Sequence, residues 1–141
     1  MEEGNKTLPL VSVLMTAYNR ANYIALAIQS VLNSTYTNFE LIIVDDRSSD
    51  NTLEIAKQFG ITDDRIKIYS NEINLGDYPN RNKAAGYASG KYLKYVDADD
   101  YIYPFGLEIL VTSMENFPDA AWGLCSIQQH QFKQPDLNGE K

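Results

Sequence analysis

The chain alternates short apolar runs with longer stretches in which apolar residues recur every three or four positions. Short runs rich in Val, Ile and Leu are typical of buried strands, and the second pattern is typical of amphipathic helices. The runs that predict strands are Leu10–Thr16, Phe39–Val44, the segment around Ile66 and Ile68, Tyr92–Val96 and Ala121–Ile127. The segments that predict helices are 24–32, 53–59 with a stop at Gly60, 78–89 with a stop at Gly90, and one that begins near Pro104 and carries Leu107, Leu110, Val111 and Met114.

This alternation of strands and helices predicts one three-layer α/β/α domain with a mostly parallel central sheet. The chain has 141 residues, 44% of them hydrophobic, which is the usual size of one domain and enough to form a core. In open sheets of this class, ligands bind beyond the carboxyl ends of the strands. Polar clusters follow three of the predicted strands and should converge on that edge: Thr16–Asn19, Asp45–Asp46 and Asp97–Asp100.

Two carboxylates, Asp97 and Asp99, follow the fourth predicted strand and are separated by a single residue. Carboxylate oxygens suit Mg²⁺ and Mn²⁺, hard ions that usually keep positions open for water or a substrate phosphate. Asp also favours turns because its side chain hydrogen-bonds to the nearby backbone, so the alternative interpretation is a solvated turn. The pair alone leaves both interpretations open.

Asp45, Asp46 and Tyr18 also allow two interpretations each. The two carboxylates are typical of a turn and of the residues that cap a following helix. A carboxylate there could instead accept the N3–H of uracil, a donor that cytosine lacks. The tyrosine could pack on the core while its hydroxyl reaches water, or its ring could stack on a planar base.

The charge and the sparse cysteine content exclude several classes of function. Twelve Lys and Arg against nineteen Asp and Glu leave a net charge of −7, which disfavours nucleic acid and anionic lipid as partners. The same charge disfavours a bare phosphate ligand, and a metal bridge between protein carboxylates and phosphate oxygens would resolve that conflict. Cys125 is the single cysteine, so an intramolecular disulfide and a cysteine-cluster zinc site are excluded. No apolar signal core or membrane-spanning stretch occurs, so we expect a cytoplasmic protein.

The glycine pattern excludes two common phosphate-binding motifs. No two of the eight glycines lie two positions apart, so the Gly-x-Gly-x-x-Gly fingerprint of dinucleotide-binding folds is absent. The Gly90-Lys91 pair has Ala85 where a P-loop needs its first glycine. A nucleotide bound here would therefore need a cation on the Asp-x-Asp pair and basic side chains such as Arg81.

Four segments together form a recognisable order of motifs. They are Val11–Arg20, Leu41–Thr52, Asn74–Gly76 with Arg81-Asn82, and Val96–Asp100. In this order and spacing they resemble the inverting family 2 glycosyltransferases, which have the GT-A nucleotide-diphospho-sugar transferase fold. The resemblance covers residues 9–128 and implies an incomplete nucleotide-sugar-binding domain there, with the C-terminal part of the fold missing. Residues 1–8 would then be a flexible segment, and the polar tail 129–141 would begin an acceptor-binding region.

The resemblance implies a role in nucleotide binding for each matching residue. Thr16 and Tyr18 would line the nucleoside pocket. Asp46 would meet the base, and Asp45 would support that turn. Arg81 would face the base or the diphosphate.

The resemblance also implies the cofactor and the chemistry. Asp99 would be the main ligand of Mn²⁺ or Mg²⁺, and Asp97 would lie near the ribose and the metal. The reaction would transfer a sugar from a nucleotide-diphospho donor, most often a UDP-sugar, to a hydroxyl of a glycan or lipid-linked acceptor in surface polysaccharide or glycan synthesis. It would invert the anomeric carbon, and the metal would act as a Lewis acid on the diphosphate.

Two departures from the family pattern qualify the expected activity. Arg47 stands where the family often has glycine, which would alter the turn or add a phosphate contact. The general base of the family comes from a later segment, and the tail offers only Asp136 and Glu140. We therefore expect the general base to lie beyond residue 141. The isolated chain would then be a donor-binding half with almost no activity. Any attachment to the inner face of the membrane would be made through the missing parts.

Two other functions remain as alternatives. The first is a non-catalytic nucleotide-sugar-binding module, which the missing base favours. The second is a sugar-phosphate nucleotidyltransferase, which should carry a glycine-rich, basic signature after its first strand. The segment Thr16–Asn19 lacks that signature.

Overall fold

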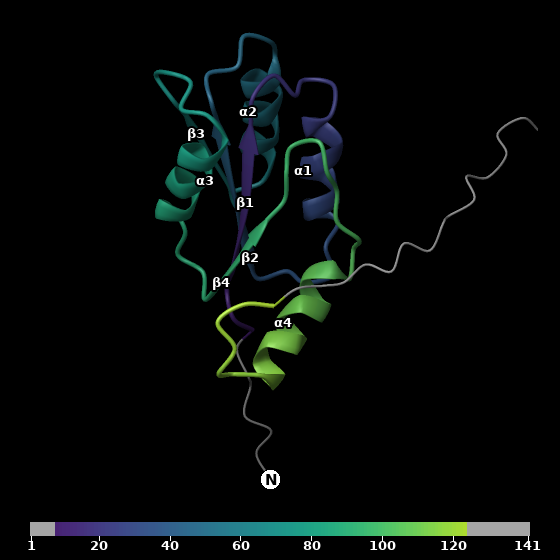
Figure 1. Cartoon of the computed structure of the whole chain (residues 1–141). Coiled ribbons are helices and arrows are strands. Elements are labelled where there is room, and N and C mark those ends of the chain that lie inside the picture. Colours follow the sequence, from purple (N-terminus) through teal and green to yellow (C-terminus); the bar gives the residue numbers. More distant parts are fainter. Residues whose placement is uncertain (1–7, 124–141) are drawn as a thin grey trace, which may run out of the picture.

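The computed structural model describes residues 8–123, in which strands and helices alternate (Figure 1). The strands are β1 (Val11–Ala17), β2 (Phe39–Asp45), β3 (Ile66–Ser70) and β4 (Tyr92–Tyr95). The helices are α1 (Ile24–Leu32), α2 (Thr52–Thr62), α3 (Asp77–Gly86) and α4 (Gly106–Asn116). No helix among these residues is long and apolar enough to cross a membrane.

The four strands form one sheet in the order β3-β2-β1-β4, and every pairing is parallel. The register places Ala17 beside Asp45, and Asp45 beside Ser70, so three strands carry their carboxyl ends to the same edge. The mostly parallel sheet predicted from the sequence is confirmed. The convergence of the polar clusters follows directly from this register.

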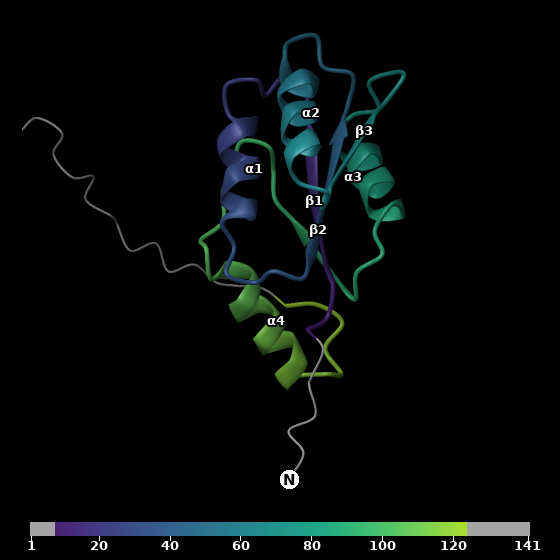
Figure 2. The ribbon, with the colours of Figure 1, turned by 180° about the vertical axis from the view of Figure 1, so that it is seen from behind.

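Helices cover both faces of the sheet, which confirms the predicted three-layer α/β architecture. One face of β1 presents Val13 and Met15 to a core shared with α1, α2 and α4. The opposite face presents Leu14 and, from β2, Ile42 to a smaller core with Ala84 of α3. Figures 1 and 2 show α3 on the other side of the sheet from α1 and α2, with α4 toward the amino ends of the strands.

Helix α1 shows how the sequence pattern produces this arrangement. Its buried residues are Ile24, Ala27, Ile28 and Val31, spaced three or four apart, so they form one stripe that faces the sheet. All seven residues of β2 are buried, as expected for a central parallel strand covered on both faces. These two features hold the loops at the carboxyl edge in place.

Helix α2 continues past Gly60, where the sequence predicted a stop. It ends at Thr62, whose hydroxyl donates to the carbonyl of Phe59. The next residue, Asp63, has an extended backbone, and its carboxylate accepts hydrogen bonds from the backbone and side chain of Arg65. The prediction was wrong because glycine inside a helix is costly but tolerated, and the chain turns only where Asp63 is held.

Helix α3 ends at Gly86, earlier than the predicted stop at Gly90. The backbone N–H of Ser89 donates to the buried carboxylate of Glu40, and the N–H of Gly90 donates to the hydroxyl of Ser12. A side chain on Gly90 would come within 2.6 Å of the Ser12 backbone nitrogen, so the close approach needs glycine. These contacts with β1 and β2 take the N–H groups that a longer helix would use.

The remaining differences lie at strand ends and chain ends. Val96 lies outside β4, and β2 includes Asp45, which was expected in the following turn. Residues 121–123 form no strand, and the rest of the predicted strand to Ile127 lies outside the described residues. The predicted tail 129–141 and all of the predicted N-terminal segment except Leu8 also lie outside them.

Candidate functional site

A cavity of about 380 Å³ lies at the carboxyl edge of the sheet, within the size range of small-molecule sites. The turn after β1, the end of β2, the first turn of α3 and the loop after β4 form its wall. The lining residues are Thr16, Ala17, Tyr18, Arg20, Asp46, Asn74, Gly76, Asp77, Asn80, Arg81, Asp97, Ala98 and Asp99. The three polar clusters do converge, and of the predicted site residues only Asp45 is not part of this lining.

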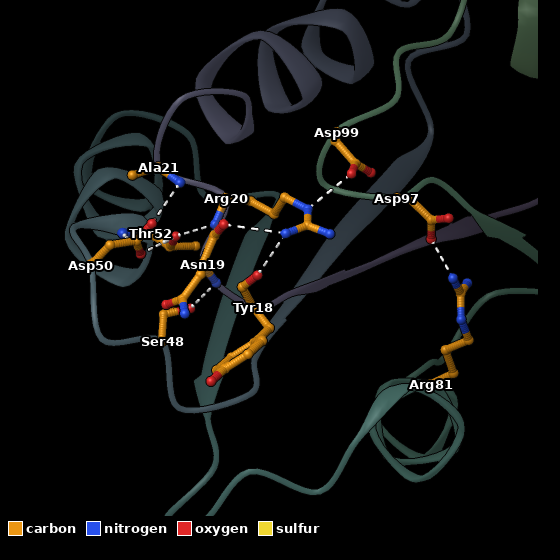
Figure 3. A network of polar contacts seen from close by, with 10 residues as sticks. All are labelled: Tyr18, Asn19, Arg20, Ala21, Ser48, Asp50, Thr52, Arg81, Asp97 and Asp99. Atoms are coloured by element: carbon orange, nitrogen blue, oxygen red, sulfur yellow. Dashed lines mark hydrogen bonds and ion pairs between the residues drawn. The ribbon is translucent and has the colours of Figure 1, made fainter.

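The turn after β1 presents Tyr18 to the cavity. Tyr18 is 48% exposed and is not among the residues that pack against either core, which favours an exposed ring over a core role. Asn19 has a left-handed backbone, with φ of 52°, and its N–H donates to the hydroxyl of Ser48 at 2.9 Å. The turn is thus held against the turn after β2, and Figure 3 shows the ring of Tyr18 pointing away from Asp97 and Asp99.

Asp45 and Asp46 have different environments although they are neighbours and both are buried. The Asp45 Oδ2 atom accepts a hydrogen bond from the N–H of Ser48 at 3.0 Å, within the turn that follows β2. Its Oδ1 atom is buried and has no hydrogen-bond partner among residues 8–123. Asp45 therefore lies beneath the turn, whereas Asp46 reaches the cavity.

Asp46 holds the loop between β3 and α3 through its carboxylate. Oδ1 accepts hydrogen bonds from the Asn71 side chain at 2.7 Å and the Leu75 N–H at 2.8 Å. Oδ2 accepts one from the N–H of Gly76 at 2.8 Å, where φ of 83° favours glycine. A carboxylate offers about four lone-pair sites, so three donors leave one for a ligand. Asp46 thus has the structural role expected of a turn residue, and its recognition of a base stays a prediction.

Each carboxylate of the Asp-x-Asp pair contacts an arginine from a different element (Figure 3). Arg81 of α3 donates from Nη2 to Asp97 at 2.6 Å and from Nε to Asp77 at 2.8 Å. Arg20, from the turn after β1, donates from Nε to Asp99 at 2.9 Å. Burial acts to lower the pKa of Arg81, but its hydrogen bonds to Asp77 and Asp97 outweigh burial and raise it, so the guanidinium stays charged.

The Asp-x-Asp pair fits a cation that takes only part of its ligands from protein. Asp97 and Asp99 are 40% and 44% exposed, and each has one carboxylate oxygen without a partner among residues 8–123. Those residues contain no group of three or more His, Cys, Asp or Glu side chains arranged to hold a metal. Mg²⁺ commonly binds through one or two carboxylates and completes its shell with water and substrate phosphates. The donor set therefore fits such an ion.

Arg47 has a left-handed backbone with φ of 61°, which explains why glycine is favoured at this position. Its side chain is exposed and donates from Nη1 to the backbone carbonyl of Glu72 in the loop before α3. It is not among the residues that line the cavity. The expected alternative of an added phosphate contact gains no support, since the guanidinium binds the neighbouring loop.

Sequence reasoning gave no role to Arg20 or to the buried amides Asn71 and Asn80. The Asn80 side chain accepts a hydrogen bond from Asn71 and donates one to the carbonyl of Val44, which ties α3 to β2. Two buried asparagines in an otherwise polar segment leave no periodic signal. The Arg20–Asp99 contact joins residues 79 positions apart, so no local pattern reveals it.

The chain matches the model of the family "Glycosyl transferase family 2" over residues 12–136. It is 45% identical over 107 residues to an uncharacterized glycosyltransferase of Haemophilus influenzae, covering 76% of this chain and 33% of that protein. It is 42% identical over 105 residues to the Escherichia coli UDP-Glc:alpha-D-GlcNAc-diphosphoundecaprenol beta-1,3-glucosyltransferase WfgD, covering 74% of this chain and 41% of that protein. The chain thus spans less than half the length of these two relatives.

Solved structures agree with the sequence relatives. S. aureus TarS in complex with UDP-GlcNAc superposes with a TM-score of 0.71 at 30% identity, over 75% of this chain and 31% of that one. The mannosyltransferase PcManGT of Pyrobaculum calidifontis, solved with GDP-Man and Mn²⁺, gives a TM-score of 0.71 at 22% identity, over 77% of this chain and 33% of that one, and shares the fold. The described residues are thus part of a GT-A fold, as the sequence predicted. The chain belongs to glycosyl transferase family 2.

Proposed function

We propose that this chain is the donor-binding part of a metal-dependent inverting glycosyltransferase. The donor is a UDP-sugar, and the acceptor is a hydroxyl of a glycan or a lipid-linked glycan in surface polysaccharide or glycan synthesis. Family membership supports sugar transfer. The observation that carries the donor assignment is the cavity at the carboxyl edge, which joins an exposed aromatic ring, a buried carboxylate and the Asp-x-Asp pair.

The base and ribose would occupy the part of the cavity near Tyr18, Thr16 and Asp46. The exposed ring of Tyr18 offers a stacking surface, and the remaining acceptor site of Asp46 suits the N3–H of uracil. The names of the relatives support uridine, since the E. coli enzyme is a UDP-Glc transferase and TarS was solved with UDP-GlcNAc. Asp45 would hold the turn beneath the base.

The diphosphate would lie toward the opposite side, where Asp97, Asp99 and the first turn of α3 meet. Asp99 and Asp97 would hold Mn²⁺ or Mg²⁺, which when bound supplies Lewis-acid stabilisation of the departing diphosphate. Arg81 keeps its charge beside Asp97 and would orient the diphosphate. The N–H groups at the start of a helix favour an anion, and Gly76 and Asp77 put that end of α3 in the cavity wall.

A general base for the acceptor is not evident in the described part of the chain. The four carboxylates that line the cavity, Asp46, Asp77, Asp97 and Asp99, each accept hydrogen bonds from an arginine or from backbone N–H groups. These contacts support our proposal that the base lies in a later segment, beyond residue 141. The same observation favours a second candidate, a module that binds nucleotide sugars without catalysis.

A transfer assay tests this proposal. We expect the isolated chain, with UDP-glucose or UDP-GlcNAc and Mn²⁺, to release UDP slowly by hydrolysis and to transfer almost no sugar to an acceptor. A positioned general base typically contributes about a hundredfold to ten-thousandfold, and the chain would lack it. Liquid chromatography of UDP and of labelled acceptor measures both outcomes. Efficient acceptor-dependent transfer by these 141 residues would overturn the assignment of the base to a later segment.

A further inference from the structure

Arg20 is held at the cavity wall by contacts with α2 and within its own turn. Its backbone N–H donates to the hydroxyl of buried Thr52 at 2.7 Å. Its Nη1 atom donates to the carbonyl oxygens of Tyr18 at 3.1 Å and Asn19 at 3.2 Å. The turn after β1 thus wraps around the side chain that it carries. These contacts orient the guanidinium toward the cavity.

The remaining contact of Arg20 joins it to the Asp-x-Asp pair. Its Nε atom donates to Asp99 Oδ2 at 2.9 Å, and the two side chains are 43% and 44% exposed. An ion pair this exposed contributes little to folding because water screens it. The Nη2 atom has no hydrogen-bond partner among residues 8–123, although Arg20 lines the cavity. The Arg20–Asp99 ion pair therefore contributes little to the fold, and the Nη2 atom of Arg20 can still donate a hydrogen bond to a ligand.

The charges around the cavity favour a further cation beside the metal and Arg81. The lining contains four carboxylates and two guanidinium groups, and a diphosphate would add further negative charge. Arg81 already donates to both Asp77 and Asp97. Figure 3 shows Arg20 reaching Asp99 and Arg81, from a different element, reaching Asp97. Arginine suits phosphate because its planar fork presents several donors at once.

We propose that Arg20 pairs with Asp99 while the cavity lacks nucleotide, and donates to the diphosphate once a divalent cation occupies Asp99. This inference rests on the proposed function, because it concerns the same donor site. The cation and the guanidinium are both positive and share the Asp99 carboxylate, so each weakens the binding of the other to Asp99. The diphosphate gives the guanidinium a new acceptor and removes that conflict. Metal and nucleotide should therefore bind cooperatively.

The test compares Arg20→Gln with a matched control, Arg65→Gln. Arg65 also donates from Nε to an aspartate, Asp63, but it lies directly before β3 and does not line the cavity. Three affinities are measured: Mn²⁺ without nucleotide, UDP at saturating Mn²⁺, and uridine, the last by NMR titration. For Arg20→Gln we expect Mn²⁺ to bind several-fold tighter, UDP about tenfold or more weaker, and uridine unchanged. Arg65→Gln should change none of the three affinities.

The outcomes separate this inference from the proposed function. Absence of metal-dependent UDP binding by the unaltered chain would overturn the proposed function and this inference with it. Normal binding by the unaltered chain, with UDP affinity unchanged in Arg20→Gln or with uridine weakened equally, would overturn the role of Arg20 alone. If Arg20→Gln fails to fold by circular dichroism, Arg20→Lys replaces it. Arg20→Lys keeps the positive charge but loses the planar guanidinium group, so we expect weaker UDP binding with unchanged Mn²⁺ affinity. An unchanged UDP affinity would overturn the inference.

Discussion

At the scale of single residues, Asp46 connects folding to the candidate site most directly. It is buried, and its carboxylate accepts three hydrogen bonds from the segment between β3 and α3, two of them from backbone N–H groups. The same residue lines the cavity, where we assign it to base recognition. Two effects of a substitution are therefore expected together. One concerns stability and the other concerns nucleotide preference.

We predict that Asp46→Asn lowers the free energy of unfolding by about 1–3 kcal/mol and weakens UDP binding, with poorer discrimination of UDP from CDP. The amide nitrogen would face the N–H of Gly76 or Leu75, leaving a donor against a donor, and it offers a donor where the carboxylate only accepts. Urea unfolding and calorimetry measure both effects. Asp64→Asn, an exposed substitution without these contacts, serves as the control. Unchanged stability and an unchanged preference for UDP would contradict this account of Asp46.

At the scale of elements, β2 carries a further buried carboxylate, near the amino ends of the strands. Glu40 accepts hydrogen bonds from the Ser12 hydroxyl at 2.5 Å, the Lys67 ammonium at 2.6 Å, and the N–H and hydroxyl of Ser89, both at 2.8 Å. Burial acts to raise the pKa of Glu40, but these hydrogen bonds outweigh burial and lower it from 4.5 to about 2. Glu40 therefore fastens β1, β3 and the loop after α3 to β2.

This shift predicts an acid-dependent loss of stability that belongs to Glu40. A carboxyl group with a depressed folded-state pKa stabilises the fold fully above its unfolded value, near pH 4.5, and loses that contribution as the pH falls through about 2. The contribution is at most about 3 kcal/mol. We expect Glu40→Gln to be less stable at pH 7 and to show a flatter dependence of unfolding free energy between these pH values. Parallel pH profiles for the two proteins, from urea unfolding, would rule the assignment out.

The elements also show what the sequence predicts and what it leaves undetermined. The strands β1 and β2 are predictable because both of their faces are buried, so continuous apolar runs mark them. The end of α3 is not, because contacts from Glu40 and Ser12, distant in sequence, decide it. The cavity lining is predictable in outline, since parallel strands bring their carboxyl ends together. The partner of Asp99 cannot be predicted from the sequence, because Arg20 meets Asp99 only in the folded chain.

At the scale of the whole molecule, net charge determines how a diphosphate can bind. The chain carries a net charge of −7, and four of its carboxylates line the cavity that we assign to a nucleotide diphosphate. Binding an anion there requires positive charge from outside the chain as well as from Arg20 and Arg81. The central claim is therefore that this cavity binds UDP only together with a divalent cation. Such binding involves only residues of the described part of the chain and does not depend on where the general base lies.

Calorimetric titration of UDP into the chain, first with Mn²⁺ and then with a chelator, tests this claim most directly. We predict binding at one site with Mn²⁺ and affinity at least about tenfold weaker after chelation. Asp99→Ala should weaken UDP binding in Mn²⁺ similarly, while its free energy of unfolding stays within about 1 kcal/mol of the original because the side chain is 44% exposed. Equal affinity with and without the cation, no binding in either case, or a parallel loss of binding and stability in Asp99→Ala would contradict the account.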